Sequence, residues 1–342
     1  MHMADALLSP AVGGTLWAAT AALTVYCAKR VRQDLDDFKV PLMGVLGAFI
    51  FAAQMINFTI PGTGSSGHLG GGMILAILLG PHAAFLVMAS VLTVQALFFA
   101  DGGLLALGAN IFNLAFFPAF IAYPLIYRPL VGARPTAGRI ALASLLAAVA
   151  SLQLGAFGVV LETVFSGIAD LPFSTFVLLM QPIHLGIGIV EGLVTAAVVN
   201  FVWKAQPDIL ERAAAVQPRG TGWSKTVLVG LGVAAAVTGG ALSWFASANP
   251  DGLEWSIAGA SGRETVNAPS DAIHRSLGAL QERTAILPDY GFASAQRAPE
   301  PAWPAVDAGT SLSGLVGGLL TLAIAIGIGW LLRRRAGALR SD

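Results

Sequence analysis

Long apolar runs are the feature that most constrains how this chain can fold. A helix needs about 20 apolar residues to cross the hydrocarbon core of a bilayer. Runs of this kind occur near residues 11–28, 40–58, 82–100, 104–127, 138–165, 173–203, 226–247 and 311–332. Only 11% of the residues are charged, whereas a soluble globular domain has about 25%. The sequence therefore predicts an all-α integral membrane protein in contact with lipid, and its zero net charge gives no indication of nucleic-acid binding.

Positively charged residues predict the direction of these helices, because they collect on the cytoplasmic side of a membrane. Three basic residues at 29–32 follow the first run, so the amino terminus is expected outside. The second run returns the chain outward and places His68 on the same side as His2. The basic residues at 128–139 must then be cytoplasmic, which requires an odd number of passes after His68. The short apolar run at 70–80 is therefore counted as a helix, one that lines a protein-enclosed cavity.

This count divides the chain into two parts. Residues 1–205 are expected to form a seven-helix bundle, and residues 206–224 are typical of a polar cytoplasmic linker. Residues 225–342 are expected to form a two-helix hairpin around an outer loop at about 249–310, with the carboxyl terminus in the cytoplasm. Only four of the nineteen basic residues fall in that loop, which supports nine spans divided seven plus two.

The histidine at position 2 directly follows the amino-terminal residue. The terminal amine of Met1, the backbone nitrogen of His2 and the His2 imidazole can therefore chelate a metal together, and one further imidazole completes a square of four nitrogens. Such a square suits Ni(II) and Cu(II), whereas a tetrahedral sulfur and nitrogen set would suit zinc. His68, in the glycine-rich segment 64–72, is the best candidate for the fourth nitrogen. The alternative is that His2 is an ordinary interfacial residue near a helix start.

Three polar residues are candidates for orienting these imidazoles from outside the ligand set. Asp5 lies one helical turn from His2, and Asn110 and Asn113 lie near the outer end of a later apolar run. Asp5 has an equally simple alternative role, because a carboxylate at a helix start is stabilised by the helix dipole.

Ionisable residues inside apolar runs are costly in a membrane and are candidates for function. Glu162, His184 and Glu191 are of this kind, and Asp101 and His82 lie nearer the ends of their runs. His184 is interpreted either as a packed polar residue or as a secondary site. The chain has no arrangement of nucleophile and base and no nucleotide-binding motif, so we do not expect an enzyme. A metal-dependent membrane enzyme or a metal sensor that uses these groups is the alternative.

The start Met1–Pro10 and the loop Ser66–Leu69 resemble the CbiM/NikM substrate-capture subunits of energy-coupling factor transporters, over about residues 1–205. The tail, with Pro250–Glu254 between two helices, is similar to their CbiN/NikN component. The resemblance implies a multi-pass protein of the bacterial inner membrane, and metal ligands at Met1, His2 and His68. It also implies ATP-driven import together with a transmembrane coupling subunit and two ATPase subunits.

The metal is expected to be the transported substrate, Ni2+ or Co2+. A square that contains an amide nitrogen favours Ni(II), and the PDGLE-type tail favours nickel by resemblance, whereas cobalt for cobalamin synthesis stays open. The tail is expected to act on metal loading, by helping the loop around His68 to open or close. His274 is the one histidine of the tail, and we expect it not to be a ligand.

Overall fold

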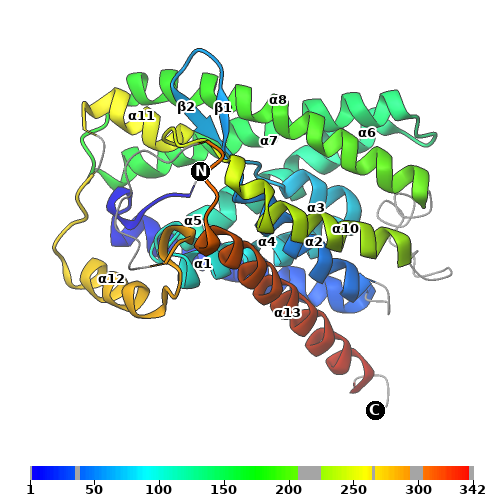
Figure 1. The fold of residues 1–342 in the computed structure, drawn as a ribbon. Helices are drawn as coiled ribbons and strands as arrows, with labels where there is room; N and C mark the ends of the chain where they lie inside the picture. The colour runs from blue at the N-terminus through cyan, green and yellow to red at the C-terminus, as the bar shows by residue number, and fades with distance from the viewer. Residues whose placement is uncertain (1, 35–38, 207–224, 264–265, 293–302, 339–342) are drawn as a thin grey trace.

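The computed structural model describes residues 2–34, 39–206, 225–263, 266–292 and 303–338 of the chain, and most of these residues are helical (Figure 1). The predicted linker at 206–224 lies outside the described residues except for its first position, and Met1 lies outside them as well. In chain order the helices are η1 (Asp5–Leu7), α1 (Pro10–Asp34), α2 (Lys39–Gln54), α3 (Gly72–Leu79), α4 (Pro81–Phe98), α5 (Leu107–Ile111), η2 (Phe112–Tyr127), α6 (Arg128–Val131), α7 (Ala137–Ser166), α8 (Phe173–Ala205), α10 (Lys225–Gly240), η3 (Leu242–Phe245), α11 (Gly252–Ser261), α12 (Ala272–Thr284), η4 (Pro288–Tyr290) and α13 (Ala308–Ala338).

Six helical segments of the described chain are long and apolar enough to cross a membrane: α1, α4, the continuous run from α5 to α6, α7, α8 and α13. Two further apolar helices, α2 and α10, have 16 residues each, and α3 has eight. The prediction of an all-α membrane protein is confirmed. The division into seven plus two spans stays a prediction, because a helix of 16 residues is shorter than the roughly 20 that a crossing needs.

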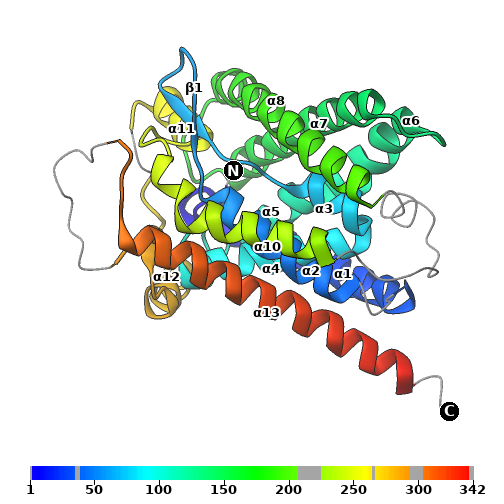
Figure 2. The same cartoon turned by 45° about the vertical axis from the view of Figure 1, so that its right-hand side comes forward.

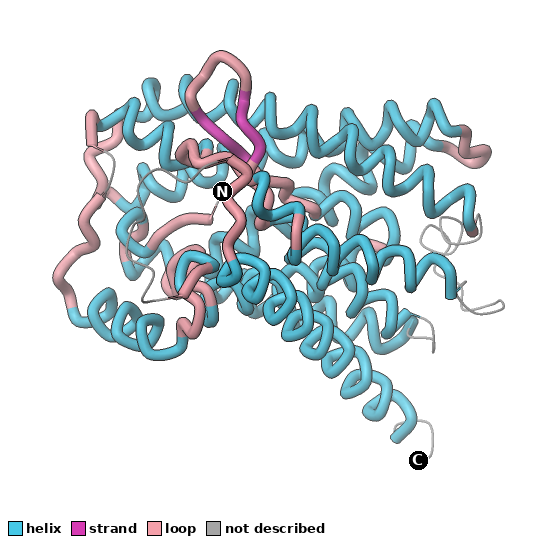
Figure 3. The backbone as a smooth tube through the Cα atoms, viewed as in Figure 1, coloured by secondary structure: helices cyan, strands magenta, loops and turns pink. Residues whose placement is uncertain are grey.

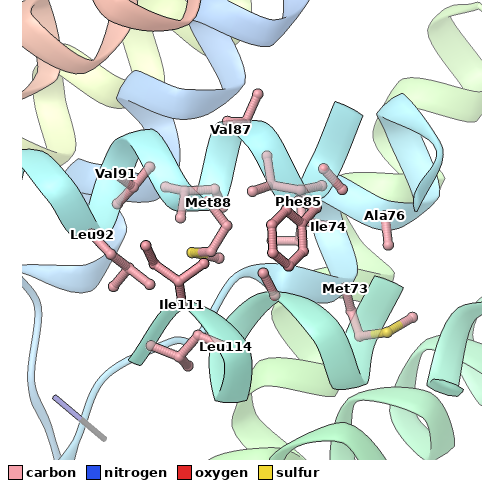
Figure 4. Close-up of a cluster of buried hydrophobic side chains, with 14 of the residues drawn as sticks. Met73, Ile74, Ala76, Phe85, Val87, Met88, Val91, Leu92, Ile111 and Leu114 are labelled. Atoms are coloured by element: carbon pink, nitrogen blue, oxygen red, sulfur yellow. The ribbon is translucent and has the colours of Figure 1, made fainter. Parts of the chain in front are cut away.

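The short helix α3 lies inside the protein. All eight of its residues are buried, which fits a helix too short to span a bilayer and therefore enclosed by other helices. It ends at Gly80, whose φ of 79° suits a glycine, and Pro81 then starts α4 at the position where proline is favoured. Figure 4 shows the core between α3, α4 and the α5–η2 segment, where Met73, Phe85 and Leu114 are buried side chains.

The segment η2 is a π-helix, which has more residues per turn than an α-helix. It contains Pro118 and Pro124, and each proline removes a backbone donor and crowds the preceding turn. Stretches of π-helix are frequent at functional sites. The segment packs on α3, α4 and α7, and its Leu114 lines a small cavity together with Gly67 and Gly70 of the glycine-rich loop.

The helices of the tail pack against the helices of residues 1–205. In Figure 2, α10 and α13 lie along α2, and the two also pack on each other. They approach closely at two glycines, where a Cβ added to Gly239 would lie only 3.0 Å from the Cα of Gly314. Close approach of this kind is common where small residues meet in pairs of membrane helices.

The predicted outer loop is not a plain loop, since Figure 3 shows helical stretches between its connecting segments. These are α11, which Asp251 starts with a capping box completed by Glu254, and α12, which Asp271 caps. An acidic residue followed three positions later by glutamate is a sequence signal of a helix start. The antiparallel hairpin of β1 (Phe58–Ile60) and β2 (Ser65–Gly67) lies beside α11 at the same end of the bundle (Figures 1 and 2).

Candidate metal centre

The segment after His2 is fixed to the bundle through its backbone. The Met3 N–H donates to Asn110 Oδ1 at 2.8 Å, and Asn110 Nδ2 donates to the Met3 carbonyl at 3.2 Å. That carbonyl also accepts the Gly103 N–H at 2.8 Å. The side chains of Met3 and Leu8 are completely buried. The position of His2 is therefore set by its neighbour Met3, which is held on both sides of its backbone.

Asp5 acts as a second anchor of this segment. Its Oδ1 accepts the Ala106 N–H at 3.0 Å, at the start of α5. Burial raises the pKa of Asp5, although its backbone hydrogen bonds oppose that shift. Asp5 thus holds the segment in place at the start of α5. Asn113 is not at this place at all, because its Nδ2 donates to Glu162 at 2.8 Å.

The two predicted imidazole ligands lie face to face. The ring centroids of His2 and His68 are 4.9 Å apart and the ring planes differ by 7°. The Nδ1 of His68 lies 3.0 Å from the Leu69 carbonyl oxygen. Neither Nε2 atom has a hydrogen-bond partner among the residues that the structure describes. Burial lowers the pKa of His68 to about 3, so the ring is neutral at ordinary pH, as a metal ligand must be.

Asp101 contacts the His2 ring at its Nδ1 atom. The His2 Nδ1 lies 3.1 Å from Asp101 Oδ1, and the Tyr290 hydroxyl donates to Asp101 Oδ2 at 2.5 Å. Burial by itself would raise the pKa of Asp101, but the electrostatic interaction with the His2 ring and the hydrogen bonds with His2 and Tyr290 lower it below the usual range. The sequence indicates Asp101 only as an ionisable residue near the end of a run, and it carries no signal that links Tyr290 to His2.

The contact between His2 and Asp101 occupies the atom that His2 needs to chelate a metal. A ring that joins the amide nitrogen of a residue to its own imidazole closes through Nδ1, because Nε2 lies on the far side of the imidazole. In the structure that atom of His2 faces Asp101. Chelation therefore requires the His2 ring to turn away from Asp101.

Glu191 fixes the glycine-rich loop that follows His68. Its carboxylate accepts the Gly70 N–H at 2.7 Å and the Gly71 N–H at 3.1 Å. From the opposite side, Gln54 Nε2 donates to the Gly70 carbonyl at 2.7 Å. Gly71 has a φ of 78°, which favours glycine. The loop is held between α2 and α8, so Glu191 positions His68 through the backbone.

His184, one of the residues whose role the sequence leaves open, lies close to this loop. It is 1% exposed, and its Nδ1 lies 2.8 Å from the Met180 carbonyl oxygen. The carboxylate of Glu191, seven residues further along α8, is bonded to the loop backbone. A small cavity is lined by His184, His68 and Asp251 among others.

The tail reaches the same loop through its backbone. Ser66, two residues before His68, donates its N–H to the Pro250 carbonyl at 2.8 Å. The Ser66 hydroxyl donates to the Asn249 carbonyl at 2.8 Å. This pairing places Asp251, the first capping residue of α11, beside the cavity. The tail residues just before α11 thus extend the β1–β2 hairpin that leads to His68.

His274 of the tail contacts the amino-terminal segment. Its Nε2 lies 3.1 Å from the Asp5 carbonyl oxygen and 3.0 Å from the Leu8 carbonyl oxygen. Its Nδ1 lies 2.6 Å from the Asp271 carboxylate. Both ring nitrogens are therefore engaged within the protein. His274 connects α12 to the segment that carries His2.

Comparisons with known proteins match both parts of the chain. Residues 2–209 match the family model described as cobalt uptake substrate-specific transmembrane region, and residues 225–334 match the PDGLE domain. The fused nickel transport protein NikMN of Rhodobacter capsulatus is 33% identical to this chain, over 98% of this chain and 100% of its own length. The cobalt transport protein CbiM of Sorangium cellulosum is 31% identical, over 64% of this chain and 97% of its own length.

A solved structure supports the same assignment. The crystal structure of a truncated transition-metal transporter aligns with a TM-score of 0.54 and 31% identity, over 60% of this chain and 99% of that chain. These relatives are transport proteins and not enzymes. With a bundle that matches one family model, a tail that matches the other and a relative aligned from end to end, the chain belongs to the CbiM/NikMN family of nickel and cobalt transport membrane proteins.

Proposed function

We propose that this chain is the substrate-capture subunit of an ATP-driven importer, and that it binds one Ni2+ or Co2+ ion on the outer side of the membrane. The ligands are the terminal amine of Met1, the amide nitrogen and Nδ1 of His2, and Nε2 of His68. The observation that carries the proposal is the stacking of the His2 and His68 rings at 4.9 Å, with the buried Nε2 of His68, the atom proposed as ligand, lacking a partner in the described part of the chain.

The surroundings of these residues support a preorganised site. Asn110 fixes the backbone that follows His2, and Glu191 fixes the backbone that follows His68. Ligands that are held before the metal arrives lose little conformational freedom on binding. An ion that displaces the Asp101 contact of His2 can therefore join the two residues without rearranging either main chain.

The orientation follows from the distribution of charge. The stacked histidines lie at the end of the bundle where the tail segment of residues 247–251 pairs with the β1–β2 hairpin, and the predicted outer loop at about 249–310 contains only four of the nineteen basic residues. Because basic residues collect in the cytoplasm, this end is the outer one. The ion then reaches the cytoplasm only when the partner proteins act, which are a transmembrane coupling subunit and two ATPase subunits.

The tail acts on loading in this proposal. Among its contacts are those with the two backbone segments that carry the histidines: Ser66, two residues before His68, and Asp5 and Leu8 after His2. His274 has both ring nitrogens engaged by protein groups, so it is not a ligand. Movement of α11 and α12 would open or close both segments together.

Nickel is the favoured substrate, because a deprotonated amide in a square of nitrogens suits Ni(II), and the fused relative from Rhodobacter capsulatus is named a nickel transport protein. The alternative, a metal-dependent enzyme or sensor, would need the ionisable residues of the spans to converge. Glu162 bonds Asn113 and Glu191 bonds the loop, so these two carboxylates serve separate structural contacts.

The proposal is tested by moving the terminal amine away from the other proposed ligands. One alanine added before Met1, or the substitution His2→Ala, should weaken Ni2+ and Co2+ binding by more than about 100-fold, beyond what loss of an outer partner of a ligand costs. Melting temperature should stay unchanged. A cleavable extension gives the control, because its removal to leave Met1 as the first residue should restore binding.

Calorimetry on the purified full-length protein measures the affinity and the number of ions bound. An alanine added after Asp342 is the matched control for extension of the chain. Stoichiometric, tight binding by the amino-terminally extended protein would show that the amine is not a ligand and would refute the proposed site.

A further inference from the structure

Two buried imidazoles from different parts of the chain share one bonding pattern. The Nδ1 atom of His68 lies 3.0 Å from the Leu69 carbonyl oxygen, and that of His184 lies 2.8 Å from the Met180 carbonyl oxygen. An Nδ1–H that donates to a carbonyl leaves Nε2 as an acceptor in the neutral ring. Within the described ranges neither Nε2 has a hydrogen-bond partner. Histidines that bind metals nearly always donate their other ring N–H in this way.

Both rings line one small cavity together with Asp251. Its volume is about 10 Å³, which is room for about one water-sized particle. The α11 helix starts beside the His184 ring, because a Cβ added to Gly252 would lie 3.4 Å from His184 Cε1. The rest of the lining consists of glycines and of the apolar side chains Leu114, Leu152 and Ile187.

A purely structural role does not account for His184. An ionisable side chain is costly inside a membrane helix, and a buried acceptor without a partner adds to that cost. The side chains around the cavity that carry polar atoms are two imidazoles, whose Nε2 atoms are acceptors, and a carboxylate. Such a set attracts a cation. Imidazole nitrogen suits nickel among the divalent ions.

We propose that His184 and His68 form a transit position, where the incoming Ni2+ or Co2+ ion is held before Met1 and His2 complete the final site. The inference rests on the proposed function. Among the described residues, no three His, Cys, Asp or Glu side chains are grouped to hold a metal. The ion in transit is therefore bound by two imidazoles and is held weakly.

His68 belongs to both positions, so the ion moves from one to the other without leaving the His68 nitrogen. Asp251 adds a negative charge beside the cavity and comes from the tail, which ties the transit position to the part of the chain that acts on loading. A transit position lowers the barrier in both directions. Its loss therefore slows association and dissociation together and leaves the equilibrium Kd unchanged, whereas loss of a final ligand raises the Kd.

The first experiment measures Ni2+ association and dissociation rates by stopped flow on the purified full-length protein. In His184→Gln we expect both rates to fall by about tenfold, the lower end of what loss of a positioned metal contact costs, with Kd and stoichiometry unchanged. The matched control is His82→Gln, which removes a histidine that packs against Tyr26 and Phe120 and should leave the rates unchanged. Melting temperatures identify any variant that is poorly folded.

The second experiment isolates the transit position. The variant His2→Ala cannot form the final site but should retain weak Ni2+ binding, because His68 and His184 remain. Adding His184→Gln to it should weaken that residual binding by about tenfold or more. Visible absorption of bound Ni2+ should show no square-planar band in either variant.

Each outcome decides between the two proposals. Unchanged rates in His184→Gln, with equal residual binding in the single and double variants, would overturn the transit position and leave the final site standing. A raised Kd in His184→Gln would overturn it as well, because His184 would then be a permanent ligand. Failure of the unmodified chain to bind either Ni2+ or Co2+ would refute the proposed function itself.

Discussion

Asn110→Ala gives the sharpest test of how the metal centre is held. Asn110 is 2% exposed, and its amide makes two hydrogen bonds to the backbone of Met3, the neighbour of His2. The two bonds are not equivalent. After truncation the Met3 carbonyl keeps the Gly103 N–H at 2.8 Å, whereas the Met3 N–H loses the partner that Asn110 provides.

The expected magnitude follows from that difference. One buried donor left without a partner costs about 1–3 kcal/mol. Without metal, the amino-terminal segment of Asn110→Ala can detach and hydrate the Met3 N–H, but metal binding forces the segment back into place. The cost therefore appears in the binding free energy, and a cost of about 1–3 kcal/mol corresponds to an affinity loss of about 5–150-fold.

Asn113→Ala is the matched control. The sequence proposes both asparagines as partners of the imidazoles, but the structure bonds Asn113 to Glu162. Asn113→Ala should therefore change the affinity by no more than about twofold, as is usual for distant, independent sites. Ni2+ titration of the two purified variants measures the difference. Equal affinities for the two variants would refute the reasoning, because the Met3 contact would then have no energetic role.

Two further substitutions test the loop and the tail. Glu191→Gln replaces a carboxylate that accepts two loop N–H groups, so the loss of one acceptor, about 1–3 kcal/mol, should weaken Ni2+ binding in a titration. Glu162→Gln should not, because the carbonyl of the introduced amide can still accept from Asn113, and equal losses in the two variants would contradict the loop anchor. His274→Ala should still bind one ion per chain by calorimetry, with slower uptake in cells, and a chain without bound ion would make His274 a ligand after all.

Local sequence patterns are enough to predict the class of this protein and the elements of its fold. The apolar runs correspond to helices, including the short run at 70–80, because burial of apolar surface and the need to satisfy backbone hydrogen bonds in lipid depend on local composition. The amino-terminal motif and the tail motif carried the resemblance that the family models bear out. The helices α11 and α12 had a readable signal as well, in the capping residues Asp251 and Asp271.

The tertiary structure decided which polar residues meet. Asn110 and Asn113 are three residues apart and chemically identical, yet one bonds Met3 and the other bonds Glu162. The contacts of Tyr290 with Asp101, and of His274 with Leu8, join residues 189 and 266 positions apart. Such pairs depend on how helices pack and on the path of the tail across the bundle. Periodicity and composition report which face of a helix is buried, but they do not report which distant backbone group that face will contact.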